Sequence, residues 1–586
     1  MTEYVRNAST RVWERPGFDG IAYSDGEEAE ERLLAALRQC RDVSSTSAEL
    51  RPHITDWPSE YHLSPVRHNL LRPFPLRASD RILELGCGCG AITRFLGESG
   101  AAVLGVEGSR RRARIAAERC RDLPNVRVAC DNLASFQSAE RFDVVTLIGV
   151  LEYARRFIDA ADPVLECLRR ARSWLAEGGT LILAIENQLG LKYFAGCAED
   201  HLDRPYYGIE GLYGERTAVT FGRKELAALL TDSGFSGQEW HYPFPDYKLP
   251  TVVVSEPALS LAQFDVPSLL FRARSLDYRG SRLRAFDESL ARRSAWKNGL
   301  LGDTANSFLV IARAGGPRSR PANALASAFN FSRHPKYCTA TRFDLQDGGA
   351  VRVSRSYALP GESRNSDGAR FAHRLVNEDY ASGPLLVESL HALARVGWSM
   401  DALARWAQPW VSLLESNLVP GAPRNLPPQF IDCTPFNCVR AASGELAYID
   451  AEWSAAGPVP LSWVFIRGLA YSLGDCLQPA EPKTDRRSIV VALGKRCGIE
   501  LTEADFGLAE KWEMEFQAHC RPTPPGRALL AEMLDIPPGG SVSIFDALVE
   551  AERETQRMRN SRSWRITKPL RSALDLARRL RAFLAS

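Results

Sequence analysis

The feature that most constrains the fold is a glycine-rich segment, Leu83-Glu84-Leu85-Gly86-Cys87-Gly88-Cys89-Gly90, placed between a predicted strand and a predicted helix. Short apolar stretches alternate with helical ones around it, and strands are expected at 82–85, 102–106, 126–129, 144–148 and 180–185. Repeated strand–helix alternation predicts a parallel sheet with helices on both faces. The sequence therefore indicates a Rossmann-like α/β domain, which binds ligands beyond the carboxyl ends of its strands.

Length and composition limit the class of protein. The chain has 586 residues, and one core rarely grows past about 250–300 residues, so at least two domains are expected. Net charge is only +2, from 73 Lys and Arg against 71 Asp and Glu, which argues against a nucleic-acid partner. The 13 cysteines form no CxxC pair and predict buried thiols in a reducing cytoplasm. No apolar run reaches the roughly 18–20 residues of a membrane span, so we expect a cytoplasmic protein and leave peripheral attachment to the inner membrane open.

Changes in pattern divide the chain into five segments. A helical and irregular segment is expected over 1–62, with one helix near residues 27–41. The α/β domain follows over 63–315, and its last strand is predicted at 307–312. Glycine, proline, serine and arginine without apolar residues predict a linker over 316–328. A second domain over 329–545 is expected to open with a hairpin of strands at 329–333 and 337–345 and to continue as helices. A basic tail over 546–586 completes the chain.

Acidic residues at strand ends indicate what the first domain binds. Glu84 precedes the glycines Gly86, Gly88 and Gly90, whose spacing is GxGxG rather than the dinucleotide GxGxxG. An acid at that point suits the cationic sulfonium and amino group of S-adenosylmethionine better than a diphosphate. Glu107 ends the second strand, where a carboxylate accepts both ribose hydroxyls. The cofactor set is completed at the next strand ends by Asp131, an acid that can read the adenine amino group, and by Asn132 and Gly149.

The ordered series Glu84, Glu107, Asp131 and Asp143 resembles the class I S-adenosylmethionine-dependent methyltransferases over roughly 63–315. The acceptor region is predicted after the fifth strand, in a polar and aromatic insertion that suits a sugar. His201 in this insertion is the candidate catalytic base for an acceptor hydroxyl. A structural histidine in a lid loop is the alternative.

A second candidate site lies in the C-terminal half. Asp432 and Asn437 have the D-x-x-x-x-N spacing of a kinase catalytic loop, in which the Asp accepts the substrate proton and the Asn holds magnesium. Asp450 follows a predicted turn, where a kinase places its second metal-binding Asp. This order resembles the C-lobe of protein and small-molecule kinases and implies ATP and Mg²⁺ as cofactors. The usual glycine loop and lysine are missing, and a phosphate would instead meet Arg333, Lys336, Arg352 or Arg355, so an inactive kinase-like domain stays open.

The tail adds a further resemblance. Apolar residues recur at helical spacing over 570–584 among arginines, which predicts a basic amphipathic helix for an anionic membrane or a partner. The order of segments resembles the bacterial O-antigen chain-terminating methyltransferase–kinase family. That resemblance implies a lipid-linked polysaccharide as substrate, methylated at a terminal hydroxyl or phosphate, and a glycosyltransferase as partner. Two alternatives stay open: a small-molecule methyltransferase fused to a regulatory pseudokinase, and a scaffold that recruits a glycosyltransferase.

Overall fold

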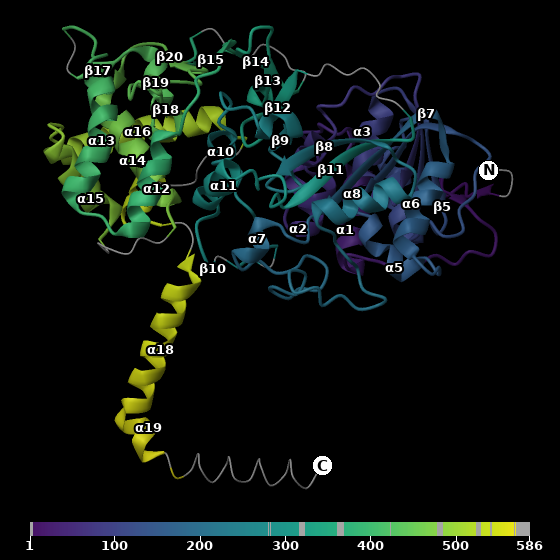
Figure 1. Ribbon diagram of the computed structural model, residues 1–586. Helices are drawn as coiled ribbons and strands as arrows, with labels where there is room; N and C mark the ends of the chain where they lie inside the picture. Colours follow the sequence, from purple (N-terminus) through teal and green to yellow (C-terminus); the bar gives the residue numbers. More distant parts are fainter. Residues whose placement is uncertain are drawn as a thin grey trace.

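The computed structural model describes residues 4–278, 280–281, 283–315, 323–359, 368–421, 424–477, 484–522, 529–539, 542–567 and 569. Its largest feature is one mixed sheet with helices on both faces (Figure 1). Five parallel strands form the centre, in the order β5 (Val126–Cys130), β4 (Ala102–Glu107), β3 (Arg81–Leu85), β6 (Phe142–Ile148) and β7 (Leu175–Glu186). Antiparallel β11 (Ser307–Arg313) then lies between β7 and β8 (Gly237–Phe244). The five predicted parallel strands and the predicted last strand are thus confirmed.

Alternation along each central strand explains the two layers of helices. Leu83 and Leu85 point into a core shared with α6 (Pro163–Ser173) and α8 (Arg223–Asp232). Ile82 points to the opposite face and packs with Ile92 and Leu96 of α3 (Ala91–Glu98). A period-two apolar pattern on both faces is what a sheet buried on both sides requires.

The sheet does not end with the first domain. β9 (Val252–Ser255) pairs with β8 and also with β12 (Ala324–Asn330), after which β13 (Thr339–Leu345), β14 (Val351–Tyr357) and β16 (Glu378–Asp379) follow in order. The hairpin expected at 329–333 and 337–345 is therefore misplaced in its first strand, which begins at Ala324 inside the range predicted as a linker. The physical reason is that Leu325 and Ala326 are buried against the first domain's core.

The N-terminal segment covers the cofactor side of the sheet. β1 (Val5–Arg6) and β2 (Trp13–Glu14) extend the sheet edge, because β2 pairs in parallel with β5. The helix expected near residues 27–41 is α1 (Glu27–Gln39), and α2 (Trp57–Leu63) follows it. Residues 1–62 thus pack onto the α/β domain.

The C-terminal half has its own apolar core. Its main helices are α12 (Leu386–Val396), α13 (Met400–Glu415), α14 (Leu461–Asp475), α15 (Arg486–Arg496) and α16 (Glu503–Cys520). Trp410 and Trp463 are fully buried among them. A short hairpin of β18 (Cys438–Arg440) and β19 (Leu446–Tyr448) encloses the turn predicted at 442–444.

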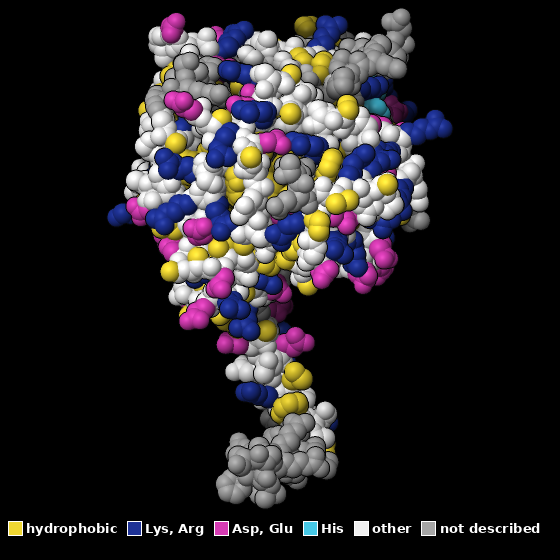
Figure 2. Space-filling model, turned by 90° about the vertical axis from the view of Figure 1, so that its right-hand side faces the viewer, with side chains coloured by type: hydrophobic (Ala, Val, Ile, Leu, Met, Phe, Trp, Pro, Cys, Tyr) yellow, Lys and Arg dark blue, Asp and Glu magenta, His cyan; other side chains and the backbone are white. Residues whose placement is uncertain are grey.

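The described part of the tail is helical and projects from the body as α18 (Ile544–Asn560) and α19 (Arg562–Ile566) (Figure 1). The amphipathic helix predicted over 570–584 lies outside the described residues. In the described part of the chain, every helix is too short or too polar to cross a membrane. Figure 2 shows basic and acidic side chains interspersed over one face of the body, which agrees with the near-neutral net charge.

Candidate active site

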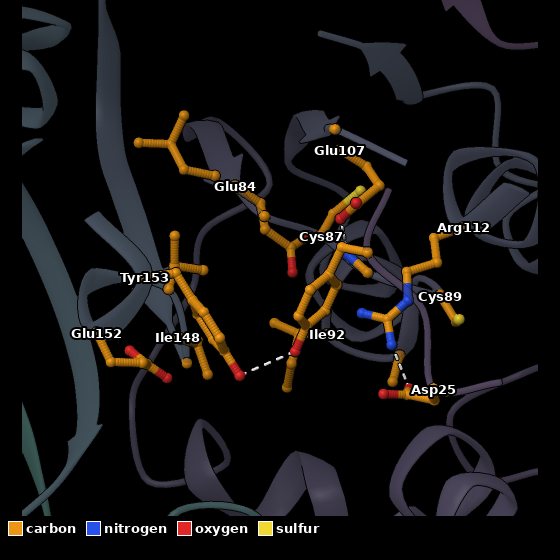
Figure 3. Close-up of a pocket in the computed structure, with 18 of the residues that line it drawn as sticks. Asp25, Glu84, Cys87, Cys89, Ile92, Glu107, Arg112, Ile148, Glu152 and Tyr153 are labelled. Atoms are coloured by element: carbon orange, nitrogen blue, oxygen red, sulfur yellow. Dashed lines mark hydrogen bonds and ion pairs between the residues drawn. The ribbon is translucent and has the colours of Figure 1, made fainter. Parts of the chain in front are cut away.

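A cavity of about 310 Å³ lies at the carboxyl ends of the central parallel strands (Figure 3). Seven of the eight predicted cofactor residues line it: Glu84, Gly86, Gly88, Glu107, Asp131, Asn132 and Gly149. The eighth, Gly90, lies just behind the lining as the N-cap of α3. The structure therefore brings together residues that the sequence predicts to meet at one edge of the sheet.

The glycine loop has a backbone that larger residues would strain. Gly86, Gly88 and Gly90 have φ values of 70°, 55° and 82°. A Cβ on Gly90 would lie 2.7 Å from the Cα of Ala116 in α4 (Arg110–Arg119), which is closer than such atoms come. The loop therefore needs glycine both for its left-handed conformation and for the close approach of α3 to α4.

Two acids with different surroundings face this loop. The carboxylate of Glu107 accepts hydrogen bonds from the backbone N–H groups of Gly88 and Ser109, both at 2.8 Å. Glu84 is buried, and its Oε2 has no hydrogen-bond partner in the part of the chain that the structure describes. Burial raises the pKa of Glu84 to about 8. A bound ammonium or sulfonium group would favour the charged form of Glu84, as the sequence argument requires.

Asp131 departs from its expected role. Its carboxylate accepts a hydrogen bond from Tyr4, forms an ion pair with Arg15 at 3.1 Å and accepts from the backbone of Asn132 at 2.7 Å. The N-terminal segment thus occupies the group that was predicted to read adenine. Asp143, which the sequence places at the opening of the fourth strand, lies at the amino end of β6 and accepts from the backbone N–H of Arg81 at 2.9 Å.

The N-terminal segment supplies site residues that the sequence argument missed. Asp25 pairs with Arg112 of α4, and His62 of α2 lies 2.9 Å from the same carboxylate (Figure 3). Trp57 and Tyr61 of α2 line the cavity as well. A helix N-cap at Asp56 was readable, but nothing in the sequence placed this helix over the cavity.

The predicted base His201 lies at the other end of the same cavity. Its Nε2 is 3.4 Å from Oε2 of Glu186, at the end of β7, and its Nδ1 is 3.1 Å from the hydroxyl of Tyr153. Burial opposes a charge on this ring, but Glu186 and Glu152 outweigh it and raise the pKa of His201 to about 9. These acids favour the charged form of the ring near neutral pH, and its role as a base stays a prediction.

A buried ion-pair network surrounds His201. Lys248 Nζ lies 2.6 Å from Glu186 Oε1 and 3.2 Å from Asp200 Oδ1, and Lys192 Nζ lies 2.8 Å from Asp200 Oδ2. Among the described residues no lysine or arginine forms an ion pair with Glu152, and burial together with Glu186 raises the pKa of Glu152 to about 8. These positions follow strand ends or lie in the insertion, but only the fold shows that they meet.

The second predicted site also assembles. Asp432, Asn437 and Asp450 line one cavity of about 530 Å³ in the C-terminal half. Asp432 ends η5 (Pro428–Asp432), and Asn437 ends η6 (Pro435–Asn437), where its amide donates to the backbone oxygen of Asp432 at 3.0 Å. Asp450 has a left-handed backbone with φ of 60°. The spacing in sequence thus does correspond to proximity in space.

The carboxylates of this second cavity face arginines. Asp432 Oδ1 lies 2.6 Å from Arg467 Nη1, and Asp450 Oδ1 lies 3.3 Å from Arg355 Nε. Six arginines and three aspartates line the cavity, an excess of three positive charges. Because both predicted carboxylates already neutralise a guanidinium, this arrangement fits a phosphate-bearing anion better than a bare Mg²⁺ ion.

Comparisons with known proteins agree with the first site. Residues 83–181 match the family model for a methyltransferase domain. A curated relative, ubiquinone biosynthesis O-methyltransferase from Methylococcus capsulatus, is 30% identical over 130 residues, which is 22% of this chain and 52% of that protein. The chain thus spans about half the length of that relative.

Solved structures with methyltransferase folds are also similar. The CcbJ methyltransferase from Streptomyces caelestis is 18% identical over 47% of this chain and 100% of its own, with a TM-score of 0.27. Phosphoethanolamine N-methyltransferase 2 from Haemonchus contortus, solved with S-adenosyl-L-methionine, is 19% identical over 43% of this chain and 52% of its own, with a TM-score of 0.26. Scores this low support no conclusion by themselves, so the assignment rests on the family model, the sequence relative and the site geometry. The chain therefore contains an S-adenosylmethionine-dependent methyltransferase domain, with S-adenosylmethionine as its cofactor.

Proposed function

We propose that this protein transfers the methyl group of S-adenosylmethionine to an oxygen on the terminal sugar of a bacterial surface polysaccharide such as O-antigen. One observation carries the proposal: the cofactor cavity is also lined by the rings of Trp57, Tyr247 and Tyr278 and by Asp200. Trp57 and Tyr278 lie with ring centroids 3.9 Å apart. Aromatic faces pack against the C–H groups of a sugar, while carboxylates accept from its hydroxyls.

The order of segments supports a polymer rather than a free sugar. A methyltransferase domain, a C-terminal domain with its own charged cavity and a projecting basic tail together resemble the O-antigen chain-terminating family. In this proposal the tail meets an anionic membrane or a glycosyltransferase, and the protein works at the cytoplasmic face of the inner membrane. A small hydroxylated aromatic acceptor is the second candidate, favoured by the curated relative, a ubiquinone biosynthesis O-methyltransferase.

The C-terminal cavity is proposed to bind a phosphate-bearing group in a kinase-like domain. The support is the meeting of Asp432, Asn437 and Asp450 in one cavity and its excess of arginines. The pairing of Asp432 with Arg467 favours binding over phosphotransfer, so we expect the methyl group on a hydroxyl. A hydroxyl is a weak acid, and His201→Ala should then reduce the methylation rate by about 10²–10⁴-fold.

The test is a methyltransfer assay on a synthetic oligosaccharide with the full-length protein, with and without ATP and Mg²⁺. We expect mass spectrometry to find one added methyl group on the non-reducing terminal sugar without ATP. An oligosaccharide already blocked at that terminus is the matched control and should gain nothing. Methylation of only a small aromatic acceptor would refute the polysaccharide proposal. Methylation that strictly requires ATP and Mg²⁺, and that Asp432→Asn abolishes, would instead show phosphotransfer followed by methylation of the phosphate.

A further inference from the structure

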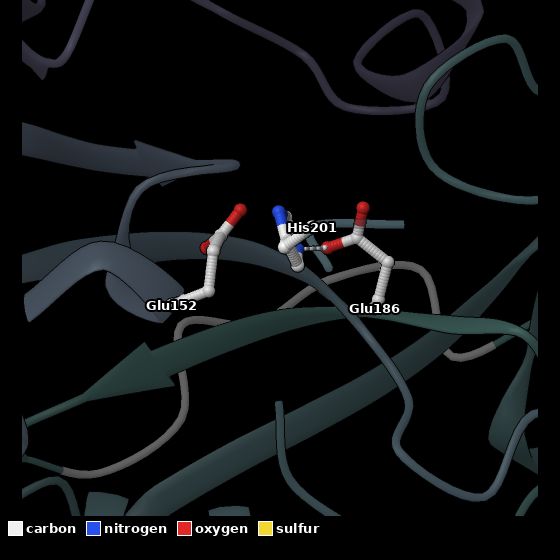
Figure 4. Close-up of side chains that lie close together, drawn as sticks. All are labelled: Glu152, Glu186 and His201. Atoms are coloured by element: carbon white, nitrogen blue, oxygen red, sulfur yellow. Dashed lines mark ion pairs between the residues drawn. The ribbon is translucent and has the colours of Figure 1, made fainter. Parts of the chain in front are cut away.

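Three buried side chains beside the cofactor region have the composition of a metal site. Glu152 belongs to η3 (Leu151–Tyr153) after β6, Glu186 ends β7, and His201 follows α7 (Leu191–Phe194). One ligand atom from each lies within 4.8 Å of the other two. Figure 4 shows the carboxyl groups of Glu152 and Glu186 on opposite sides of the His201 ring.

Glu152 supplies the second, independent observation. Its side chain is fully buried and lines the cavity, and among the described residues neither carboxyl oxygen has a hydrogen-bond partner. A buried polar group without a partner costs about 1–3 kcal/mol. Lys248 balances Glu186, but it forms no ion pair with Glu152 among the described contacts. The Glu152 carboxyl group, which lies beside His201, is therefore left unsatisfied.

The geometry of the other two residues already suits shared coordination. At metal–ligand bonds of about 2.1 Å, two ligands of one ion lie roughly 3–3.4 Å apart. His201 Nε2 and Glu186 Oε2 are 3.4 Å apart. Glu152 has to approach by at most about 1.5–2 Å to complete the set, a shift within reach of its flexible side chain.

A surrounding hydrogen-bond chain fits the same function. Nδ1 of His201 lies 3.1 Å from the Tyr153 hydroxyl, which lies 2.9 Å from the Tyr23 hydroxyl. A cation bound at Nε2 would leave the proton of the ring on Nδ1, where it can donate to the Tyr153 oxygen. Metal-ligating histidines donate their second N–H to an oxygen in this way, and that bond holds the ring in position.

We propose that Glu152, Glu186 and His201 bind one divalent cation, and that this cation holds an acceptor through two adjacent oxygens. Two carboxylates and one imidazole suit ions such as Mg²⁺, Mn²⁺ or Zn²⁺ and leave coordination positions for the acceptor. The acceptor part rests on the proposed function, whereas cation binding does not. A cation held there would lower the pKa of an acceptor hydroxyl, whose proton would pass to solvent; the oxygen–methyl bond would form as the sulfonium–methyl bond breaks, and S-adenosylhomocysteine would leave. In this arrangement His201 acts as a ligand of the cation and not as the base.

The test is a titration of the chelator-treated full-length protein with Mn²⁺. Binding is measured by calorimetry and by electron paramagnetic resonance of the free Mn²⁺. We expect one bound Mn²⁺ per chain and at least tenfold weaker binding in Glu152→Gln. Glu199→Gln is the matched control, because Glu199 is a buried acid that accepts the backbone N–H of His201 at 2.8 Å but is outside the ligand set. It should bind Mn²⁺ like the wild type. Pulsed resonance should show nitrogen coupling that His201→Ala removes.

Two outcomes overturn the proposal: no Mn²⁺ or Zn²⁺ binding by the wild type at millimolar concentration, or equal Mn²⁺ binding by wild type and Glu152→Gln. Thermal melting and S-adenosylmethionine binding check that each variant is folded. Methyltransfer to the oligosaccharide that survives complete chelation would remove the cation from the reaction and leave the proposed function intact. Mn²⁺ binding without methylation of the oligosaccharide would leave the cation site intact and refute the proposed function.

Discussion

Replacing Glu107 by alanine tests the cofactor site most directly. A carboxylate offers about four acceptor positions. Two are used by the backbone N–H groups of Gly88 and Ser109, which leaves two for the ribose hydroxyls. Loss of the carboxylate leaves both the ribose and the loop N–H groups without their acceptor, and we expect this to weaken binding by about 1–3 kcal/mol, which is about 5- to 150-fold in Kd.

Isothermal titration of S-adenosylmethionine and of S-adenosylhomocysteine measures this loss. Asp143→Ala is the control, because Asp143 is an acid of the same sheet at the amino end of β6, away from the cavity. Its Kd should stay near that of the wild type. If Glu107→Ala binds the cofactor with an unchanged Kd while remaining folded, the ribose-binding role of Glu107 is wrong.

Two further predictions concern the junction of the two halves and the tail. His391 of α12 lies 2.9 Å from Asp287, the N-cap of α11 (Glu288–Lys297). Burial lowers the pKa of His391, but Cys476 and Asp287 outweigh it and raise that pKa from 6.5 to about 10, so its contribution is complete below pH 6.5 and is lost as pH rises toward 10. The melting temperature of His391→Asn should therefore fall furthest below that of the wild type near pH 6 and approach it near pH 10, and a pH-independent difference would contradict this. For the tail, vesicles with anionic lipid should sediment the full chain, less so at high salt, and a chain truncated after Arg559 should stay in solution. Equal sedimentation of both chains, or equal binding to zwitterionic vesicles, would exclude a basic membrane anchor.

The cofactor half of the site was predictable because its signals are local. Gly86, Gly88 and Gly90 lie within one turn, and Glu107 ends the next strand, so knowing the strands is enough to place them together. Asp131 shows the limit of this reasoning. Its position is as predicted, yet Tyr4 and Arg15 come from a segment more than a hundred residues earlier and occupy its carboxylate.

The kinase-like spacing shows the same division. Asp432, Asn437 and Asp450 are close in sequence, and they meet around one cavity. The partners that decide their chemistry are remote: Arg467 lies on α14, and Arg355 lies on β14 in the extended sheet. A pattern of three residues does not reveal which charges face it.

Sequence alone determined the α/β class, the positions of the central strands along the chain, and the glycine loop. The reason is that period-two burial and left-handed turns are properties of a few neighbouring residues. Tertiary structure decided the rest. It joined β12 to β9 across the expected linker, because Leu325 and Ala326 find their burial in the first domain. It also brought Glu152, Glu186 and His201 together, because three chain segments meet at the same edge of one sheet. Contacts between such distant segments produce no regular residue spacing from which the sequence could predict them.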